Sequence, residues 1–207
     1  MIYSSFGNRK EKKIALTFDD GPNPPITNQV LDILKDYNVK GNFFLLGNYA
    51  KENEATVKEI YRRGHLIGVH GYHHEKGVNP EFEIAAEIIE RITKEKPIFY
   101  RPPYGDLKLC LFSNYFQLNP QLKIILFDVD SLDYKSKKEE IIEKVLKETQ
   151  NGSIIDFHDS SQHLKEKKTR PLEMLKALPE IILKLKEKGF LILRLDEMDL
   201  IFKEFKN

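Results

Sequence analysis

The chain has 207 residues, of which 41% are hydrophobic and 31% are charged, enough for one globular domain with a substantial core. Its 33 basic and 32 acidic side chains leave a net charge of +1, which gives no electrostatic signature of a nucleic-acid-binding protein. The single cysteine, Cys110, excludes an intrachain disulfide and any zinc site built from cysteines alone.

Nothing in the sequence predicts insertion into a membrane. No apolar run reaches the length of about 18 residues that a membrane-spanning helix needs. The first 13 residues are polar and lack the apolar core of a signal peptide. We therefore expect a cytoplasmic protein, or an exported one whose signal has been removed.

Short apolar runs and longer amphipathic stretches alternate along the chain, which predicts strands and helices in turn. In chain order, the predicted strands are 13–18, 42–46, 66–69, 98–101, 123–127, 153–157 and 190–195. The predicted helices are 26–37, 50–63, 80–93, 107–118, 137–149 and 171–188.

Strands that alternate with helices favour an α/β fold with a parallel sheet covered by helices. At this length, a barrel of seven or eight strands is the natural arrangement, since closure removes exposed edges. An open, doubly wound sheet is the alternative, although no glycine-rich phosphate loop follows any predicted strand. No linker or internal repeat divides the sequence, so we predict a single domain over residues 1–207.

Two adjacent carboxylates, Asp19 and Asp20, stand where the first predicted strand ends. Neighbouring side chains on an extended backbone point in opposite directions, so these two can serve different roles, one on a metal and one on a substrate. Gly21 and Pro22 follow and are typical of a tight turn. A turn with no catalytic role is the simpler interpretation. It is less favoured because the ends of other predicted strands supply partners for the two carboxylates.

Reactive side chains follow five of the predicted strands, at the carboxyl end in each case. They are Asp19 and Asp20, then His70, His73 and His74, then Arg101 to Tyr104, then Asp128, Asp130, Asp133 and Tyr134, and finally His158 and Asp159. The carboxyl ends of parallel strands form one face of a barrel, so these segments are predicted to meet there. That agreement of positions predicts an active site.

A His-x-x-x-His pattern, His70 to His74, predicts a metal site. On one turn of helix this spacing would place both imidazoles on the same side. Together with Asp20, they would give two nitrogen ligands and one oxygen ligand, and leave a coordination position open, as catalytic zinc requires. His73 is an alternative to His74, because position i+3 faces the same way.

The sequence resembles the polysaccharide deacetylase family, carbohydrate esterase family 4, also called the NodB-homology domain. The resemblance runs from about Lys13 to about Leu195 and is carried by five motifs in the family's order. They are Thr17–Pro22, His70–His74, Arg101–Gly105, Asp130–Tyr134 and Asp156–His158. The resemblance implies a distorted (β/α) barrel of about seven strands, which agrees with the strand count above.

The resemblance also implies a role for each matching residue. Asp20, His70 and His74 would hold a divalent metal, most often Zn²⁺, with Co²⁺, Ni²⁺ and Mn²⁺ as alternatives. Asp19 would be the general base, held in place by Arg101, and His158 would be the general acid, oriented by Asp133. Tyr104 would offer its backbone N–H to the oxyanion. Pro103, Tyr104, Tyr134 and Asp156 would line the substrate site.

Two residues depart from the family pattern. Gly71 stands where the family usually has Ser or Thr, so a hydroxyl close to the metal ligands is missing, and loss of such a partner can weaken metal binding by roughly 10–100-fold. Asp156 stands where the family usually has an apolar residue beside the acetyl methyl. Either Asp156 turns away from the pocket, or the acyl site is altered and favours a formyl or a polar acyl group.

The function implied is metal-dependent removal of N-acetyl groups from N-acetylated amino sugars in a glycan, such as peptidoglycan or chitin-type oligosaccharides. Hydrolysis of a small non-sugar amide, formamide or imide is the alternative, and that class often lacks the Asp-His-His residues kept here. A catalytically silent glycan-binding module would be expected to have lost Asp19 or His158, and both are present. The sequence does not predict an oligomeric state.

Overall fold

The computed structural model describes residues 2–74, 81–108, 119, 121–161 and 170–204. Its strands are β1 (Ile2–Ser4), β2 (Lys13–Asp19), β3 (Asn42–Leu46), β4 (Leu66–Gly71), β5 (Phe99–Tyr100), β6 (Lys123–Ile125), β7 (Val129–Asp130), β8 (Ile154–His158), β9 (Leu191–Ile192) and β10 (Lys203–Glu204). Its helices are α1 (Ile26–Asp36), α2 (Gly47–Glu52), α3 (Glu54–Arg62), α4 (Glu81–Thr93), α7 (Lys138–Glu148) and α8 (Arg170–Glu187). Short 3₁₀ turns cover Pro103–Gly105 and Leu195–Glu197.

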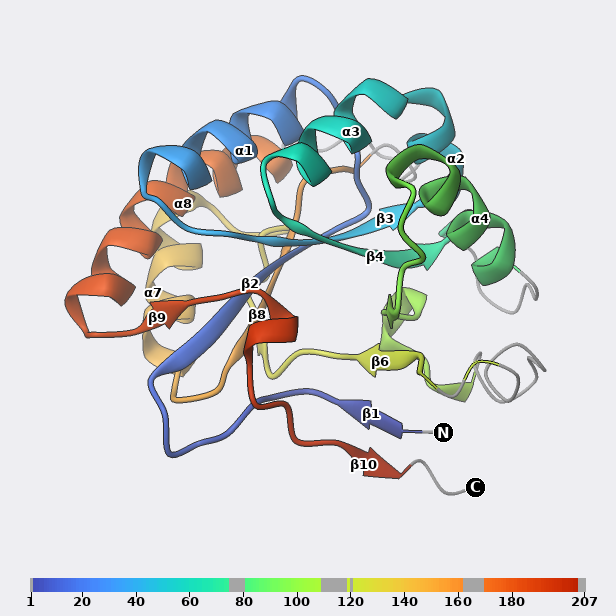
Figure 1. Cartoon of the computed structure of the whole chain (residues 1–207). Helices are drawn as coiled ribbons and strands as arrows, with labels where there is room; N and C mark the ends of the chain where they lie inside the picture. The colour runs from blue at the N-terminus through green and yellow to red at the C-terminus, as the bar shows by residue number, and fades with distance from the viewer. Residues whose placement is uncertain (1, 75–80, 109–118, 120, 162–169, 205–207) are drawn as a thin grey trace.

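The strands form one curled sheet in the order β10-β1-β6-β5-β4-β3-β2-β8-β7, and β9 pairs with β2 outside this path. All pairs are parallel except β1 with β10. Figure 1 shows the helices α1, α3 and α4 arched over the outside of the sheet, with α7 and α8 beside them. The distorted α/β barrel that the sequence predicted is confirmed. Among the described residues, however, the sheet has two ends, at β7 and β10, so it is not a closed ring.

Strand alternation separates the packing on the two faces of the sheet. On β2, Ile14, Leu16 and Phe18 belong to the apolar cluster under the helices, whereas Ala15 belongs to a smaller cluster on the inner face. Thr17 continues the inner row and is fully buried. Because side chains alternate along a strand, the outer face of β2 anchors the helices while its inner face ends in polar groups.

The predicted helix 50–63 is wrong in one respect, because the structure has two helices, α2 and α3, that meet at Asn53. Asn53 has φ −126° and ψ 45°, which is not helical. Its side-chain amide donates a hydrogen bond to the carbonyl of Tyr49 at 2.9 Å, and its own carbonyl accepts from Thr56 N–H at 2.9 Å. Asn side chains compete in this way with the helical hydrogen bonds, which ends one helix and begins the next.

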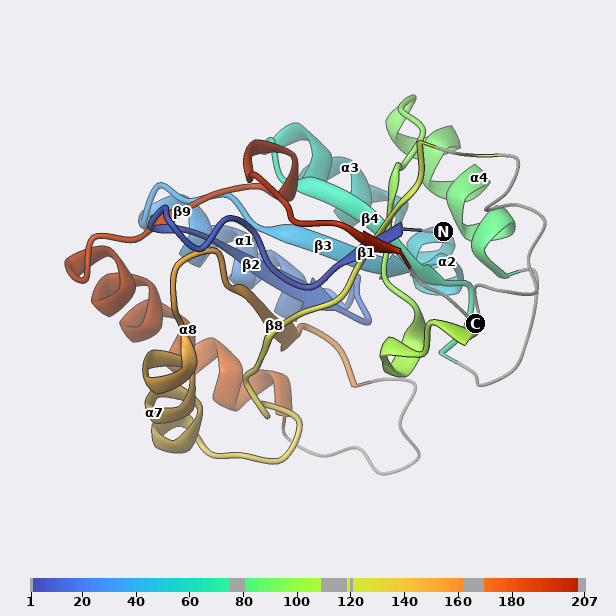
Figure 2. The same cartoon turned by 90° about the horizontal axis from the view of Figure 1, so that it is seen from below.

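Three short strands, β1, β7 and β10, were not predicted from the sequence. β1 and β10 pair with each other and lie together in both views (Figures 1 and 2), and Figure 1 shows them on the side of the sheet away from α1 and α3. β7 has two residues and pairs with β8. Strands of two or three residues are too short to show a period of two.

The predicted helix 107–118 lies almost entirely outside the described residues. Within the described part of the chain, no helix is long and apolar enough to cross a membrane.

His65 joins the starts of β3 and β4 in the core. Its Nδ1 accepts a hydrogen bond from the N–H of Gly41 at 3.0 Å, and its ring packs edge-on against Phe43. Burial, with a smaller effect from nearby Lys40, lowers the pKa of His65 from 6.5 to about 4. The folded protein therefore keeps this imidazole neutral through the mildly acidic range.

We predict that His65 makes the stability of the protein fall as the pH is lowered from about 6.5 to 4. In that window the unfolded chain binds a proton at His65 that the folded chain does not, and the difference amounts to about 3 kcal/mol of unfolding free energy. His65→Gln keeps an acceptor for Gly41 and does not titrate. Urea unfolding at pH 7 and pH 4 should show a smaller loss for this variant than for the wild type, and equal losses would contradict the prediction.

Candidate active site

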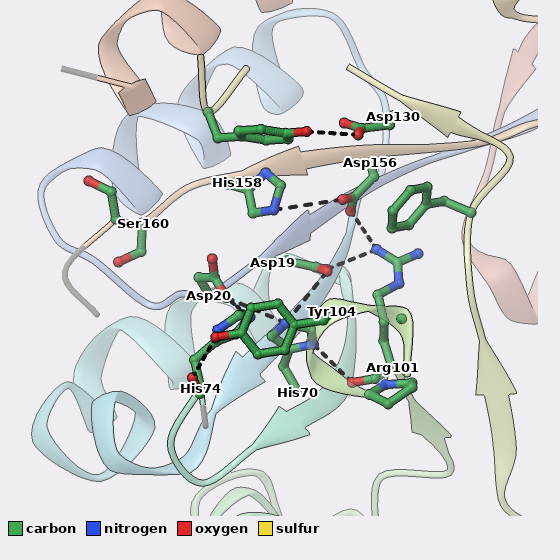
Figure 3. Close-up of a pocket in the computed structure, with 15 residues that line it drawn as sticks. Asp19, Asp20, His70, His74, Arg101, Tyr104, Asp130, Asp156, His158 and Ser160 are labelled. Carbon is green, nitrogen blue, oxygen red and sulfur yellow. Dashed lines mark hydrogen bonds and ion pairs between the residues drawn. The ribbon is translucent and has the colours of Figure 1, made fainter. Parts of the chain in front are cut away.

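A pocket of about 370 Å³ opens at the carboxyl ends of the central strands (Figure 3). Most of the residues that the sequence singled out line it, namely Asp19, Asp20, His70, His74, Arg101, Tyr104, Tyr134, Asp156 and His158. Asp133 is not among the lining residues, but it is hydrogen-bonded to His158, which is. Pro103 was predicted to contact substrate, but it is buried and does not line the pocket, whereas its neighbours Pro102 and Tyr104 do.

Asp19 and Asp20 both line this pocket, although strict strand alternation would have separated them. Asp19 ends β2 on the inner face, in line with Thr17. Asp20 then takes a φ of 72°, which is the left-handed region that Asp tolerates better than most residues. This turn of the backbone brings the second carboxylate to the same side as the first. A pattern of residue types does not predict such a change.

Asp20, His70 and His74 form the group of described residues that could hold a metal ion, with one ligand atom from each lying within 4.8 Å of the others. Asp20 Oδ1 is 3.4 Å from His70 Nε2 and 3.5 Å from His74 Nε2. The structure brings the two histidines together as predicted, but not on a helix, because His70 belongs to β4 and the chain bends at residues 72–74. His73 is exposed, packs against Tyr72 and does not belong to this group.

The His70 ring is oriented by the backbone of the next strand. Its Nδ1 donates a hydrogen bond to the carbonyl of Arg101 at 2.8 Å, which fixes the proton on Nδ1 and makes Nε2 the nitrogen that can ligate a metal. Gly71, which follows, has a φ of 110° beside a register shift between β3 and β4. A Ser or Thr side chain would be strained in this conformation, so here the backbone carbonyl supplies the orienting contact.

The donor set fits a divalent cation. Two imidazole nitrogens and one carboxylate oxygen suit zinc and its neighbours in the first transition series. Burial, assisted by the charge of Asp19, raises the pKa of Asp20 to about 8. A buried carboxylate in this position is short of compensating positive charge, and a cation between Asp20, His70 and His74 would supply it.

Arg101 is the buried cation of the site, with only 1% of its surface exposed. One guanidinium nitrogen, Nη1, donates to Asp19 Oδ1 at 2.9 Å and to Asp156 Oδ1 at 2.6 Å. The other nitrogens donate to the carbonyls of Ile125 and Leu126, both at 3.2 Å. Burial raises the pKa of Asp19 and the Arg101 charge opposes that rise. Arg101 therefore holds the Asp19 carboxylate in place inside the pocket.

His158 stands in register with Asp19 on the neighbouring strand, and Asp133 holds its side chain. Its Nδ1 lies 2.8 Å from Asp133 Oδ1, and its backbone N–H donates to Asp133 Oδ2 at 2.7 Å. Burial alone would lower the pKa of His158, but the carboxylates of Asp133 and Asp156 outweigh it and raise the pKa well above 6.5. The protonated form of the imidazole, which lines the pocket, is thus favoured.

Two tyrosines flank the pocket mouth. Tyr104 is 57% exposed, packs edge-on against the His74 ring, and has a φ of 60°. Tyr134 packs edge-on against His158 and donates its hydroxyl hydrogen to Asp130 Oδ2 at 3.3 Å. Aromatic faces at both edges of a polar pocket suit a ring-shaped, partly apolar substrate.

Asp159 is a buried carboxylate that the sequence analysis placed at a strand end without a specific role. It accepts a hydrogen bond from the Thr27 hydroxyl, and its backbone N–H donates to the carbonyl of Asp19 at 3.3 Å. Its carboxylate packs so closely on Gly21 that no Cβ would fit there, and burial raises its pKa to about 7. Asp159 thus ties the loop of the two aspartates to β8, and only the fold brings these segments together.

Two held titratable side chains beside a group that could bind a cation are typical of a metal-dependent hydrolase. The polysaccharide deacetylase family model matches residues 6–113, and the chain belongs to this family, whose members hydrolyse carbon–nitrogen bonds other than peptide bonds.

The relatives of this chain include two bacterial peptidoglycan deacetylases. One is the peptidoglycan-N-acetylmuramic acid deacetylase PdaC of Bacillus subtilis, 31% identical over 94% of this chain, which spans 40% of that relative. Another is a peptidoglycan-N-acetylglucosamine deacetylase of Bacillus cereus, 34% identical over 99% of this chain and 74% of the relative.

Solved structures share the fold. The Bc1960 peptidoglycan N-acetylglucosamine deacetylase superposes with a TM-score of 0.83 at 34% identity. The match covers 95% of this chain and 92% of the Bc1960 chain. A second solved structure is a mutant of BA3943, a pseudoenzyme of the same family with restored enzymatic activity. It superposes with a TM-score of 0.81 at 26% identity, and the match covers 95% of this chain and 70% of the BA3943 chain.

We predict that His74→Ala lowers the affinity for zinc by about 100-fold or more, because even partners outside the ligand set contribute roughly 10–100-fold. His73→Ala is the matched control, since its exposed imidazole lies beside the site without joining it. Zinc content after dialysis against a competing chelator would measure the difference. Equal losses in the two variants would contradict the assignment of His74.

We predict that Asp133→Asn moves the alkaline limb of the pH profile of kcat/KM to lower pH. Without the Asp133 charge, the pKa of His158 falls, so His158 loses the proton that it donates at a lower pH. Asp130→Asn is the control, because Asp130 contacts the Tyr134 hydroxyl rather than His158. An alkaline limb that stays in place in Asp133→Asn would rule out His158 as the acid.

Proposed function

We propose that this chain is a metal-dependent N-deacetylase that hydrolyses the acetamide of N-acetylated amino sugars in peptidoglycan or chitin-type oligosaccharides, to give a free amine and acetate. The observation that carries this proposal is that two held groups, Asp19 on Arg101 and His158 on Asp133, line the same pocket as the Asp20–His70–His74 cluster. The peptidoglycan deacetylases among its relatives support the same substrate class.

Amide hydrolysis needs an activated water, a stabilised oxyanion and a protonated leaving amine. A divalent cation, when bound by Asp20, His70 and His74, would lower the pKa of water and polarise the acetamide carbonyl; zinc is the ion that we expect, with cobalt, nickel and manganese as alternatives. Asp19 removes a proton from the attacking water, and Arg101 fixes the carboxylate for that task. The backbone N–H of Tyr104 is the proposed donor to the oxyanion.

His158 completes the reaction by giving its proton to the amide nitrogen as the carbon–nitrogen bond breaks. An amine leaves poorly as an anion, so the rate depends on this transfer. Asp133 keeps the imidazole charged and aims Nε2 at the pocket. The rings of Tyr104 and Tyr134 would hold the sugar at the mouth of the pocket, so that its acetamide reaches inward.

The alternatives have less support. A small non-sugar amide would not need the aromatic residues at the pocket mouth. A silent glycan-binding module would not need a protonated His158 in the same pocket as Asp19. The fold alone does not separate an active enzyme from such a module, since a pseudoenzyme of the family shares the fold. The presence of Asp19 and His158 in one pocket supports the active enzyme.

The proposal is tested by acetate release from N-acetylglucosamine oligomers and from peptidoglycan, with metal-stripped protein before and after addition of zinc or cobalt. We expect release that depends on metal and increases with oligomer length. No release from either polymer by protein shown to hold zinc would overturn the proposal and favour the small amide.

We predict that Asp19→Asn abolishes turnover, with a loss of about 100-fold or more, while zinc content stays near that of the wild type. Asn keeps the size of the side chain and an acceptor for Arg101, but it cannot take the proton of the attacking water. Substantial activity in this variant would exclude Asp19 as the base. A parallel loss of zinc would place Asp19 among the ligands instead.

A further inference from the structure

Asp156 is a buried carboxylate at the floor of the pocket. It stands on the inner face of β8, two residues before His158, and is 2% exposed. It pairs in register with Thr17 of β2, so it lies beside the row that ends in Asp19. Strand alternation therefore aims it into the pocket, of which it is a lining residue (Figure 3).

The two oxygens of Asp156 have different surroundings. Oδ1 accepts from Arg101 Nη1 at 2.6 Å and from the Thr17 hydroxyl at 3.3 Å. Oδ2 lies 3.8 Å from His158 Nε2, which is too long for a hydrogen bond, and among the described residues no hydrogen bond reaches it. A polar oxygen is thus left facing the pocket, between the base Asp19 and the acid His158.

The proposed reaction limits what can lie against this oxygen. In the tetrahedral intermediate, the carbonyl carbon carries four groups: the incoming oxygen near Asp19, the oxyanion, the nitrogen near His158 and the acyl substituent. The first three have their partners elsewhere in the pocket. The acyl substituent is left for the floor between Asp19 and His158, which is where Asp156 stands.

We propose that Asp156 is a specificity-determining residue that makes the acyl site polar, and that the preferred substrates are amino sugars with an N-hydroxyacyl group, such as N-glycolyl, rather than N-acetyl. This inference rests on the proposed function and deepens it. Hydrolysis would break the same carbon–nitrogen bond, with the oxygen of water joining the acyl carbon and a proton passing to the amine, and would release hydroxyacetate.

A hydroxyl on the acyl group satisfies Asp156 where a methyl group does not. An acetyl methyl would displace water from Oδ2 and give no hydrogen bond in return, which is costly in a buried site. The hydroxyl of a glycolyl group can donate to Oδ2 when the carboxylate is ionised, and can accept from it when it is protonated. The preference therefore holds in either state.

The test compares kcat/KM for matched glucosamine oligomers that carry N-acetyl or N-glycolyl groups. A hydrogen bond to a charged group predicts that the wild-type enzyme favours N-glycolyl by roughly 10–100-fold. Asp156→Leu should remove this preference and raise kcat/KM for N-acetyl. Asp156→Asn keeps an acceptor for Arg101 and a hydrogen-bonding group toward the pocket, and should retain part of the preference even if the Leu variant does not fold.

A binding measurement separates recognition from turnover. In the Asp19→Asn background, Kd for the N-glycolyl oligomer should be lower than for the N-acetyl oligomer, and adding Asp156→Leu should equalise the two. A wild-type enzyme that favours N-acetyl, or a ratio that Asp156→Leu leaves unchanged, would overturn the inference while leaving the deacetylase proposal intact. Failure to release either acyl group would instead overturn the proposed function.

Discussion

The site depends on the buried guanidinium of Arg101. A single cation, 1% exposed, is shared by Asp19 and Asp156 and donates to two backbone carbonyls where the chain leaves β6. The faces of Phe44 and Phe127 lie 4.4 Å and 5.3 Å from it and exclude water. Removing one partner of such a buried group costs about 3–5 kcal/mol, so the positions of both carboxylates are fixed together. The carbonyl of the same residue orients His70, which links the base to the cation site.

Period-two alternation supplies the second constraint. β2 and β8 are adjacent and parallel, with Asp19 in register with His158. Their outward residues, such as Phe18 and Phe157, stack in the core under the helices. Packing of that apolar layer therefore determines which side chains reach the pocket, and a slip of one residue would turn the base and the acid away from it.

Much of this arrangement could be predicted from the sequence, because apolar runs mark strands and the reactive residues follow them. The class of fold, the triad of Asp20, His70 and His74, and the meeting of Asp19 with His158 follow from that pattern and from the family motifs. The positive φ of Asp20, the break at Asn53 and the burial of Pro103 do not, because they depend on local backbone geometry. The partners of Asp156 and Asp159 come from strands distant in sequence, so only the fold reveals them.

The central claim is that Asp20, His70 and His74 hold the cation. Asp19 is not a ligand, because its hydrogen bond to Arg101 holds it in place as the general base. The most direct test is a crystal structure of the zinc-loaded protein with anomalous data collected at the zinc edge. We expect one strong peak at about 2.0–2.2 Å from Asp20 Oδ1 and from Nε2 of both histidines, with Asp19 still hydrogen-bonded to Arg101. A zinc ion bridged by Asp19 and Asp20, or one ligated by His73 in place of His74, would contradict the claim.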